Sequence, residues 1–66
     1  MPSNAARAAE LNELIDQTMG NLDTMRDLVD AQSARGDREA VLRTMRRQAE
    51  AAERLVRFTR ELVTLI

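Results

Sequence analysis

The apolar residues of this chain recur at steps of three and four positions in two separate segments. Such steps place residues on one face of an α-helix. The first set is Leu11, Ile15, Thr18, Leu22, Met25 and Val29, and the second is Val41, Met45, Gln48, Ala52, Leu55, Thr59, Leu62 and Ile66. The pattern predicts two amphipathic helices whose stripes face each other.

The three residues Arg35, Gly36 and Asp37 separate the two patterns. Glycine adopts the left-handed conformation that commonly ends a helix, and aspartate is a preferred N-cap of the next one. Ser3 or Asn4 can cap the first helix in the same way. We predict an all-α fold, an antiparallel two-helix hairpin forming a single domain over residues 1–66, with helices at about 4–34 and about 38–66 and a turn at 35–37.

The second segment carries more apolar positions than one neighbouring helix can cover. Its apolar arc spans about 180°, whereas a helix facing a single core needs about 100°. A second seam on it comprises Ala51, Leu55, Phe58, Leu62 and Leu65, with Val56, Val63 and Ile66 on the other flank. On the first segment Leu14 and Leu28 lie outside the main stripe. We predict that partner-binding residues are those of the second seam, from Ala51 to Leu65, together with Leu14 and Leu28.

Helices with two adjacent seams are typical of a four-helix bundle, where each helix contacts two neighbours. A chain of 66 residues without disulfides also has little core of its own. We therefore expect the hairpin to complete a coiled-coil-like bundle, either as a homodimer or with another helical protein. Residues 1–34 hold two arginines and six acidic residues, a balance of −4, whereas residues 37–66 hold seven arginines and five acidic residues, a balance of +2. Opposite signs favour antiparallel pairing within the hairpin, and equally favour an antiparallel dimer in which the first helix meets the second helix of the other copy.

Catalytic chemistry has few candidate residues in this chain. Cysteine and histidine are absent, which excludes thiolate and imidazole metal sites, thiol nucleophiles and histidine acid–base catalysis. Carboxylate pairs such as Glu10 with Glu13 are expected on helix faces directed to water, without the walled pocket that shifts a carboxyl pKa. We predict a non-enzymatic protein with no catalytic, metal or cofactor-binding residues and no small-molecule substrate.

The charge and hydropathy of the chain indicate whether it binds nucleic acid or membrane. The ten arginines and eleven acidic residues give a net charge of −1. An arginine face on the second helix suggests an alternative, a small nucleic-acid-binding regulator, but glutamates interleave with those arginines and Phe58 is the only aromatic residue. No apolar run approaches the ~20 residues of a membrane span, and Met1 to Asn4 lack the order of a secretion signal. We expect a cytoplasmic protein that binds neither nucleic acid nor membrane.

The layout of the chain, with an N-terminal helix, Arg35-Gly36-Asp37 near the middle and a C-terminal helix ending in aliphatic residues, resembles the small co-chaperones of type III secretion needle subunits. Those bacterial proteins are helical hairpins that pair with a tetratricopeptide-type chaperone and help to keep the needle subunit unpolymerised in the cytoplasm. The resemblance covers residues 11–66. It implies a needle-subunit co-chaperone in a hetero-complex, as an alternative to a homodimeric adaptor or assembly factor.

Overall fold

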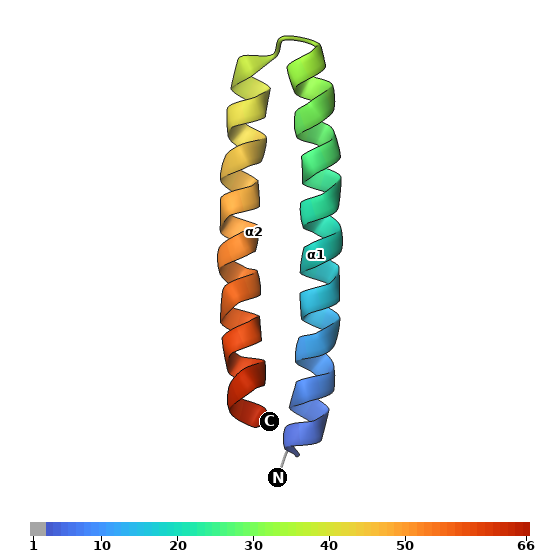
Figure 1. Cartoon of the computed structure of the whole chain (residues 1–66), viewed down its shortest axis with the longest axis vertical. Helices are drawn as coiled ribbons and strands as arrows, with labels where there is room; N and C mark the ends of the chain where they lie inside the picture. Colours follow the sequence, from blue (N-terminus) through green and yellow to red (C-terminus); the bar gives the residue numbers. More distant parts are fainter. Residues whose placement is uncertain (1–2) are drawn as a thin grey trace.

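A computed structural model describes residues 3–66 and contains two helices joined by a short turn (Figure 1). Helix α1 comprises Asn4–Ala34 and α2 comprises Arg38–Leu65. The helices lie side by side and antiparallel, so the start of α1 and the end of α2 share one end of the hairpin (Figure 1). The predicted all-helical hairpin is confirmed. The part of the secretion-signal prediction that concerns Met1 and Pro2 lies outside the described residues.

Helix α1 has an N-cap residue before its first turn and continues without interruption. The Ser3 hydroxyl oxygen accepts a hydrogen bond from the Ala6 N–H at 3.1 Å, so the cap is Ser3 rather than Asn4. Gly20 lies in the middle of the helix and does not break it. The side of the backbone at Gly20 is open, because a Cβ placed there would meet nothing within 4 Å.

The three-residue turn supplies hydrogen bonds to the free backbone groups at the end of α1 and at the start of α2. Gly36 has a φ of 71°, the left-handed conformation predicted for it. Its N–H donates to the Ser33 carbonyl and the Asp37 N–H donates to the Gln32 carbonyl, both at 3.0 Å, which together form a Schellman motif. The Asp37 carboxylate then accepts from the Ala40 N–H at 3.2 Å and caps α2. Asp37 therefore closes one helix and opens the next.

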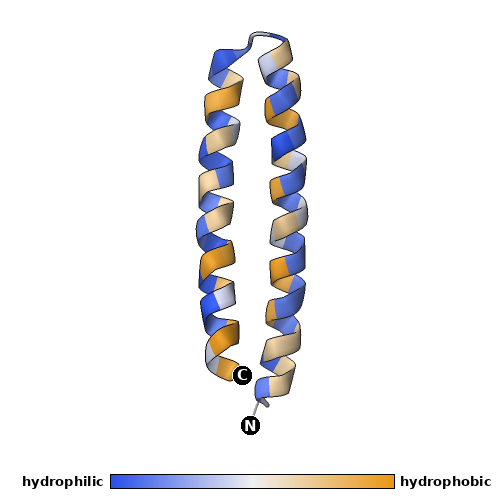
Figure 2. Cartoon of the chain, viewed as in Figure 1, coloured by the Kyte–Doolittle hydropathy of each residue, from blue (hydrophilic) through white to orange (hydrophobic). Residues whose placement is uncertain are grey.

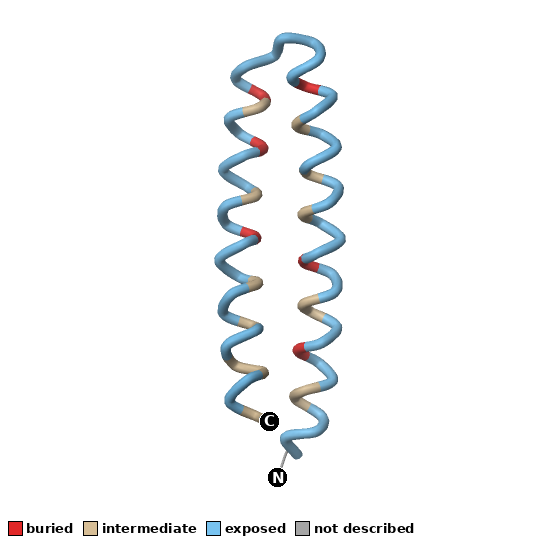
Figure 3. The backbone as a smooth tube through the Cα atoms, viewed as in Figure 1, coloured by how far each residue is buried: buried red, intermediate tan, exposed pale blue. Residues whose placement is uncertain are grey.

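The two helices pack along seams with heptad spacing, the pattern of an antiparallel coiled coil. Every member of both seams is buried or half-buried, on the inner sides of the helices (Figure 3). The seam of α1 is Leu11, Ile15, Thr18, Leu22, Met25, Val29 and Gln32, and the seam of α2 is Val41, Thr44, Gln48, Ala51, Leu55, Phe58, Leu62 and Leu65. The stripe predicted for α1 is thus the one that packs.

The stripe predicted for α2 is partly wrong. Met45, Ala52, Thr59 and Ile66 are exposed, and Met45 retains 48% of its accessible surface. The expected and the observed seams share every second member, and they differ in which side of those shared residues turns toward α1. The two sides carry equal numbers of apolar residues, so periodicity does not distinguish them. The packed side is the one whose Thr44 hydroxyl finds an acceptor on α1, the Gln32 side-chain carbonyl.

The core between the helices is small and partly polar. Among the described residues the buried apolar side chains are Leu11, Ala40 and Ala51, and Leu11 is the one large side chain that is fully enclosed. Buried polar residues contribute as many positions, including Thr44 and Gln32, which form a hydrogen bond of 2.9 Å from the Thr44 hydroxyl to the Gln32 side-chain carbonyl. Polar residues alternate with apolar ones along both helices (Figure 2). The hairpin therefore buries little apolar surface for its length.

The molecule is a thin rod of 52 × 15 × 14 Å. Its radius of gyration is 15.3 Å, compared with about 11 Å for a compact domain of the same length. It exposes 5192 Å², whereas a compact monomer of 7.5 kDa exposes about 4,200 Å². Within residues 3–66 neither helix has a segment long and apolar enough to cross a membrane.

Candidate functional site

A second heptad-spaced stripe runs along the side of α2 that α1 leaves uncovered. We call it the outer stripe, and all of its members are exposed. They are Leu42, Met45, Ala49, Ala52, Val56, Thr59, Val63 and Ile66. Val63 and Ile66 keep 67% and 91% of their accessible surface. Because the stripe has the same steps of three and four as the packed seam, it can receive a further helix in the same way.

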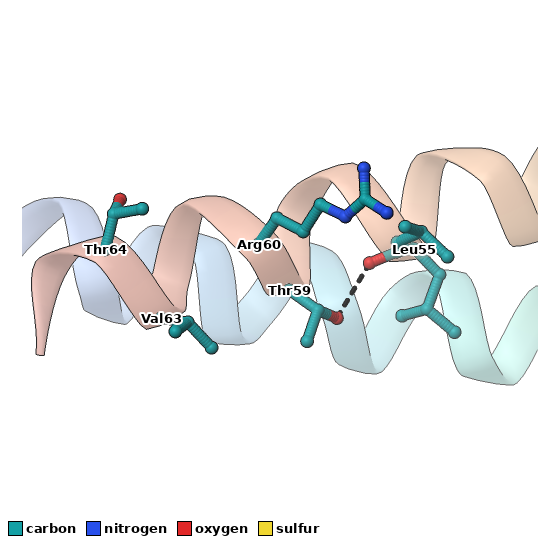
Figure 4. A pocket seen from close by; sticks show the side chains of 6 residues that line it. Leu55, Thr59, Arg60, Val63 and Thr64 are labelled. Carbon is teal, nitrogen blue, oxygen red and sulfur yellow. Dashed lines mark hydrogen bonds between the residues drawn. The ribbon is translucent and has the colours of Figure 1, made fainter.

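The C-terminal half of the outer stripe forms a groove. Six residues line it, namely Leu55, Val56, Thr59, Arg60, Val63 and Thr64, around a volume of about 650 Å³ (Figure 4). The Thr59 hydroxyl donates to the Leu55 carbonyl at 2.7 Å, and the Thr64 hydroxyl donates to the Glu61 carbonyl at 2.6 Å. Both hydroxyls are thus satisfied by the helix itself, which leaves their methyl groups for the groove surface.

A row of four charged residues borders the outer stripe on the side away from α1. We call it the charged row, and it comprises Glu39, Arg46, Glu53 and Arg60, all exposed. Glu39 and Arg46 line a shallow groove together with Leu42, and Glu53 and Arg60 line another together with Val56. The apolar stripe therefore has a charged border of alternating sign along its length.

Five of the seven predicted partner-binding residues belong to the seam that packs against α1: Ala51, Leu55, Phe58, Leu62 and Leu65. Ala51 has no accessible surface, because α1 encloses it, so a partner of the intact hairpin cannot reach it. Leu55 lies at the border of the two stripes and also lines the groove. Leu14 is half-buried, and Leu28 is exposed on α1. The predicted second seam of α2 is thus an interface within the hairpin, and the outer stripe is the surface left over.

Most of the outer stripe could have been found in the sequence. From the sequence, Val56 and Val63 are placed only on a flank of the apolar arc, and Ile66 both there and in the predicted stripe. Counting back from them in steps of three and four reaches Ala52, Ala49, Met45 and Leu42. Leu42 was missed because its neighbour Val41 already satisfied the pattern. Two interleaved heptad patterns on one helix are the signal for a helix with two packing faces.

One ion pair ties the open end of the hairpin together. Arg7 of α1 donates to both carboxylate oxygens of Glu61 of α2, at 2.5 and 2.9 Å, and also pairs with Glu10 at 3.0 Å. The hydrogen bonds from Arg7 hold the pKa of Glu61 below its ordinary value, and those to Glu61 raise the pKa of Arg7. This pair joins the helices and takes no part in the outer stripe.

The opposite side of the hairpin is polar. A shallow groove there is lined by Asn21, Thr24 and Met25 from α1 and by Arg47, Glu50 and Arg54 from α2. Among residues 3–66, acidic side chains form no group of three or more that could hold a metal ion. The two sides of the hairpin therefore differ, one carrying a continuous apolar stripe and the other mixed charges.

Comparisons of the chain with protein-family models, with curated proteins and with solved structures found no match. A long apolar stripe with a charged border on a helix is the arrangement with which one helix packs against another.

Proposed function

We propose that this protein is a non-enzymatic protein–protein interaction module, an adaptor or assembly factor, that acts as a homodimeric helical bundle joined through the outer stripe of α2. The observation that carries the proposal is the stripe itself: five large apolar side chains on one helix face are left exposed, namely Leu42, Met45, Val56, Val63 and Ile66. Their heptad spacing matches the seam already used between α1 and α2. Two hairpins joined in this way form a four-helix bundle.

The surface area of the hairpin supports self-association. The rod exposes roughly 1,000 Å² more than a compact monomer of its mass, from 5192 Å² against about 4,200 Å². A standard interface buries about 800 Å² on each partner. Covering one face of one long helix removes an area of that order, so a dimer restores the burial that the hairpin alone lacks.

The test is the mass of the purified chain in solution, measured by size exclusion with light scattering over a range of concentrations. We expect a dimer of about 15 kDa, twice the 7.5 kDa chain, and expect Val56→Asp to shift it to a monomer that keeps its helicity. Leu28→Asp is the matched control, because Leu28 is exposed to a similar extent but lies on α1, in line with Asn21 on the opposite side. A carboxylate buried in an apolar interface has a high desolvation cost, whereas one at an exposed position does not.

Two results would contradict the proposal. A helical monomer at all concentrations would exclude the homodimer and would favour a foreign helical partner, as in the needle-subunit co-chaperones that the layout resembles. A dimer that survives Val56→Asp but is lost with Leu28→Asp would move the interface to the opposite side of the hairpin.

A further inference from the structure

The charged row has an order that depends on the direction of α2. Its signs alternate at every seventh residue, from Glu39 through Arg46 and Glu53 to Arg60. Seven residues of helix rise by about 10.5 Å, so neighbours in the row are too far apart to form an ion pair with each other. The ion pairs found among residues 3–66 join Arg7 to two glutamates and do not involve the row. Read from the other end of α2, the signs are reversed.

We infer that the occupant of the outer stripe is α2 of a second copy, laid antiparallel in the register that pairs all four charges of the row. In this register Arg46 lies beside the partner subunit's Glu53, and Glu39 lies beside the partner subunit's Arg60. Each pair occurs twice, because the two-fold axis crosses the interface at the level of residue 50. The inference rests on the proposed self-association and adds its orientation and register.

The sizes of the stripe residues fit the same register. Ala49 lies opposite the partner subunit's Ala52 at the centre, where small side chains allow the two backbones to approach. In the layers on either side of that centre, Met45 lies opposite the partner subunit's Val56. The larger side chains fill the wider space between the two helices there. An antiparallel pair of helices has this geometry, because each of the two alternating core positions of one helix faces the other kind of core position on the partner helix.

Other registers do not pair the charges. A shift by one heptad preserves the apolar stripe but places Arg46 beside the partner subunit's Arg60, or Glu39 beside the partner subunit's Glu53. Like charges placed side by side at a helix interface disfavour the arrangement. In a parallel pair the row would lie beside uncharged residues of the packed seam, such as Gln48 and Leu55, and would form no ion pairs. The alternation thus selects both direction and register.

The register also covers the C-terminal end of the stripe. Val63 and Ile66 extend past the central layers to the level of the partner's turn. A groove of about 240 Å³ lies at that turn, lined by Ser33, Gly36, Asp37, Arg38 and Val41. Arg38 is in line with the outer stripe, since it precedes Met45 by seven residues. In the proposed dimer Val63 and Ile66, the two large apolar side chains with the highest exposed fractions, therefore lie against this groove.

Charge reversal in trans tests this register. Arg46→Glu alone places two carboxylates beside each other at both symmetric positions, and Glu53→Arg does the same with two guanidinium groups. We expect each single variant to dimerise about tenfold more weakly than the original chain in sedimentation equilibrium. In the heterodimer of the two variants, both symmetric contacts again join a carboxylate to a guanidinium group, one with the original signs and one with the signs reversed. Native mass spectrometry of an equimolar mixture should then show heterodimer in clear excess over the roughly one half expected of random exchange.

The matched controls are Arg47→Glu and Glu50→Arg, two residues that line the groove on the opposite side. They change the net charge of the chain by the same amounts as Arg46→Glu and Glu53→Arg, so a general attraction between oppositely charged chains affects both mixtures equally. If the first mixture contains no more heterodimer than the control mixture, the register is wrong, while the homodimer itself stands. If the unmodified chain does not dimerise at all, the proposed homodimer is itself wrong, and the register with it.

Cysteine cross-linking tests the direction independently, because the chain contains no cysteine of its own. We expect Met45→Cys mixed with Val56→Cys to form an intermolecular disulfide on oxidation, and expect Met45→Cys alone to form much less. Efficient cross-linking of Met45→Cys to itself would overturn the antiparallel arrangement and support a parallel one. Thr24→Cys, on the opposite side of the hairpin, is the control for random collision.

Discussion

The buried hydrogen bond between Thr44 and Gln32 should contribute measurably to stability, and a double-mutant cycle isolates it. The two residues retain 4% and 9% of their accessible surface, and their oxygens are 2.9 Å apart. Thr44→Val keeps the shape of the side chain but removes the one donor that the structure gives the side-chain carbonyl oxygen of Gln32. Leaving a buried acceptor unpaired costs about 1–3 kcal/mol, so we expect the free energy of unfolding to fall by about that amount.

The reverse substitution should cost less. In Gln32→Leu the Thr44 hydroxyl can turn back to the backbone carbonyl one turn earlier, as the hydroxyls of Thr18 and Thr59 already do at 2.7 Å. The added leucine also buries apolar surface. The double variant, with no buried polar pair, should be close to the original chain in stability or above it, which gives a coupling energy of about 1 kcal/mol.

The assay is urea unfolding followed by far-ultraviolet circular dichroism, with all four chains at the same concentration because stability is linked to association. Equal stability of Thr44→Val and the original chain, together with additive effects in the double variant, would show that this hydrogen bond does not stabilise the hairpin. Another interaction would then have to explain why α2 contacts α1 with the face that carries Thr44.

Four further outcomes are expected. Gly20→Ala should raise the free energy of unfolding by about 0.5–1 kcal/mol in thermal or urea unfolding, because Gly20 is helical and a Cβ there meets nothing within 4 Å. Gly36→Val should lower it by about 1 kcal/mol or more, since φ is 71° at Gly36, and a neutral effect would contradict the hairpin turn. Glu61→Gln should reduce the loss of stability on acidification: the pKa of Glu61 is lowered by Arg7, so its contribution is present above the ordinary glutamate pKa and is lost as the pH falls through the lowered value. Phe58→Asp should unfold the hairpin, with a cost of roughly 2–4 kcal/mol and a loss of helical signal, because Phe58 packs against α1; retained helicity would argue for a different seam.

Local signals in the sequence were sufficient for the fold. Gly36 and Asp37 specify a helix end and a helix start through their own backbone and side-chain preferences, and the structure shows both caps. Hydrophobic periodicity was also sufficient for the packed stripe of α1, which has only one set of heptad positions to offer. These features depend on residues within one turn of each other, so they can be derived without knowing what lies across the interface.

The face of α2 that meets α1 could not be derived in that way. The predicted stripe with Met45 and the packed seam with Thr44 share every second residue on α2, and each contains six apolar residues, so a count of apolar residues does not choose between them. The choice depends on a partner from α1, because Gln32 supplies an acceptor for the Thr44 hydroxyl. Such complementarity involves residues far apart in sequence, so the predicted partner-binding seam became the internal seam.

The three-residue turn also sets the order in which the hairpin can form. Closing a loop costs more entropy as the loop grows, so the ends of the helices next to Gly36 meet first and pairing proceeds away from the turn. The Arg7–Glu61 pair, separated by 54 residues, closes last. Residues 55–64 then belong to the segment that opens first when the native state fluctuates, and amide hydrogen exchange should be fastest toward this end in the isolated chain. A second copy bound along the outer stripe would slow that exchange most at the end farthest from the turn.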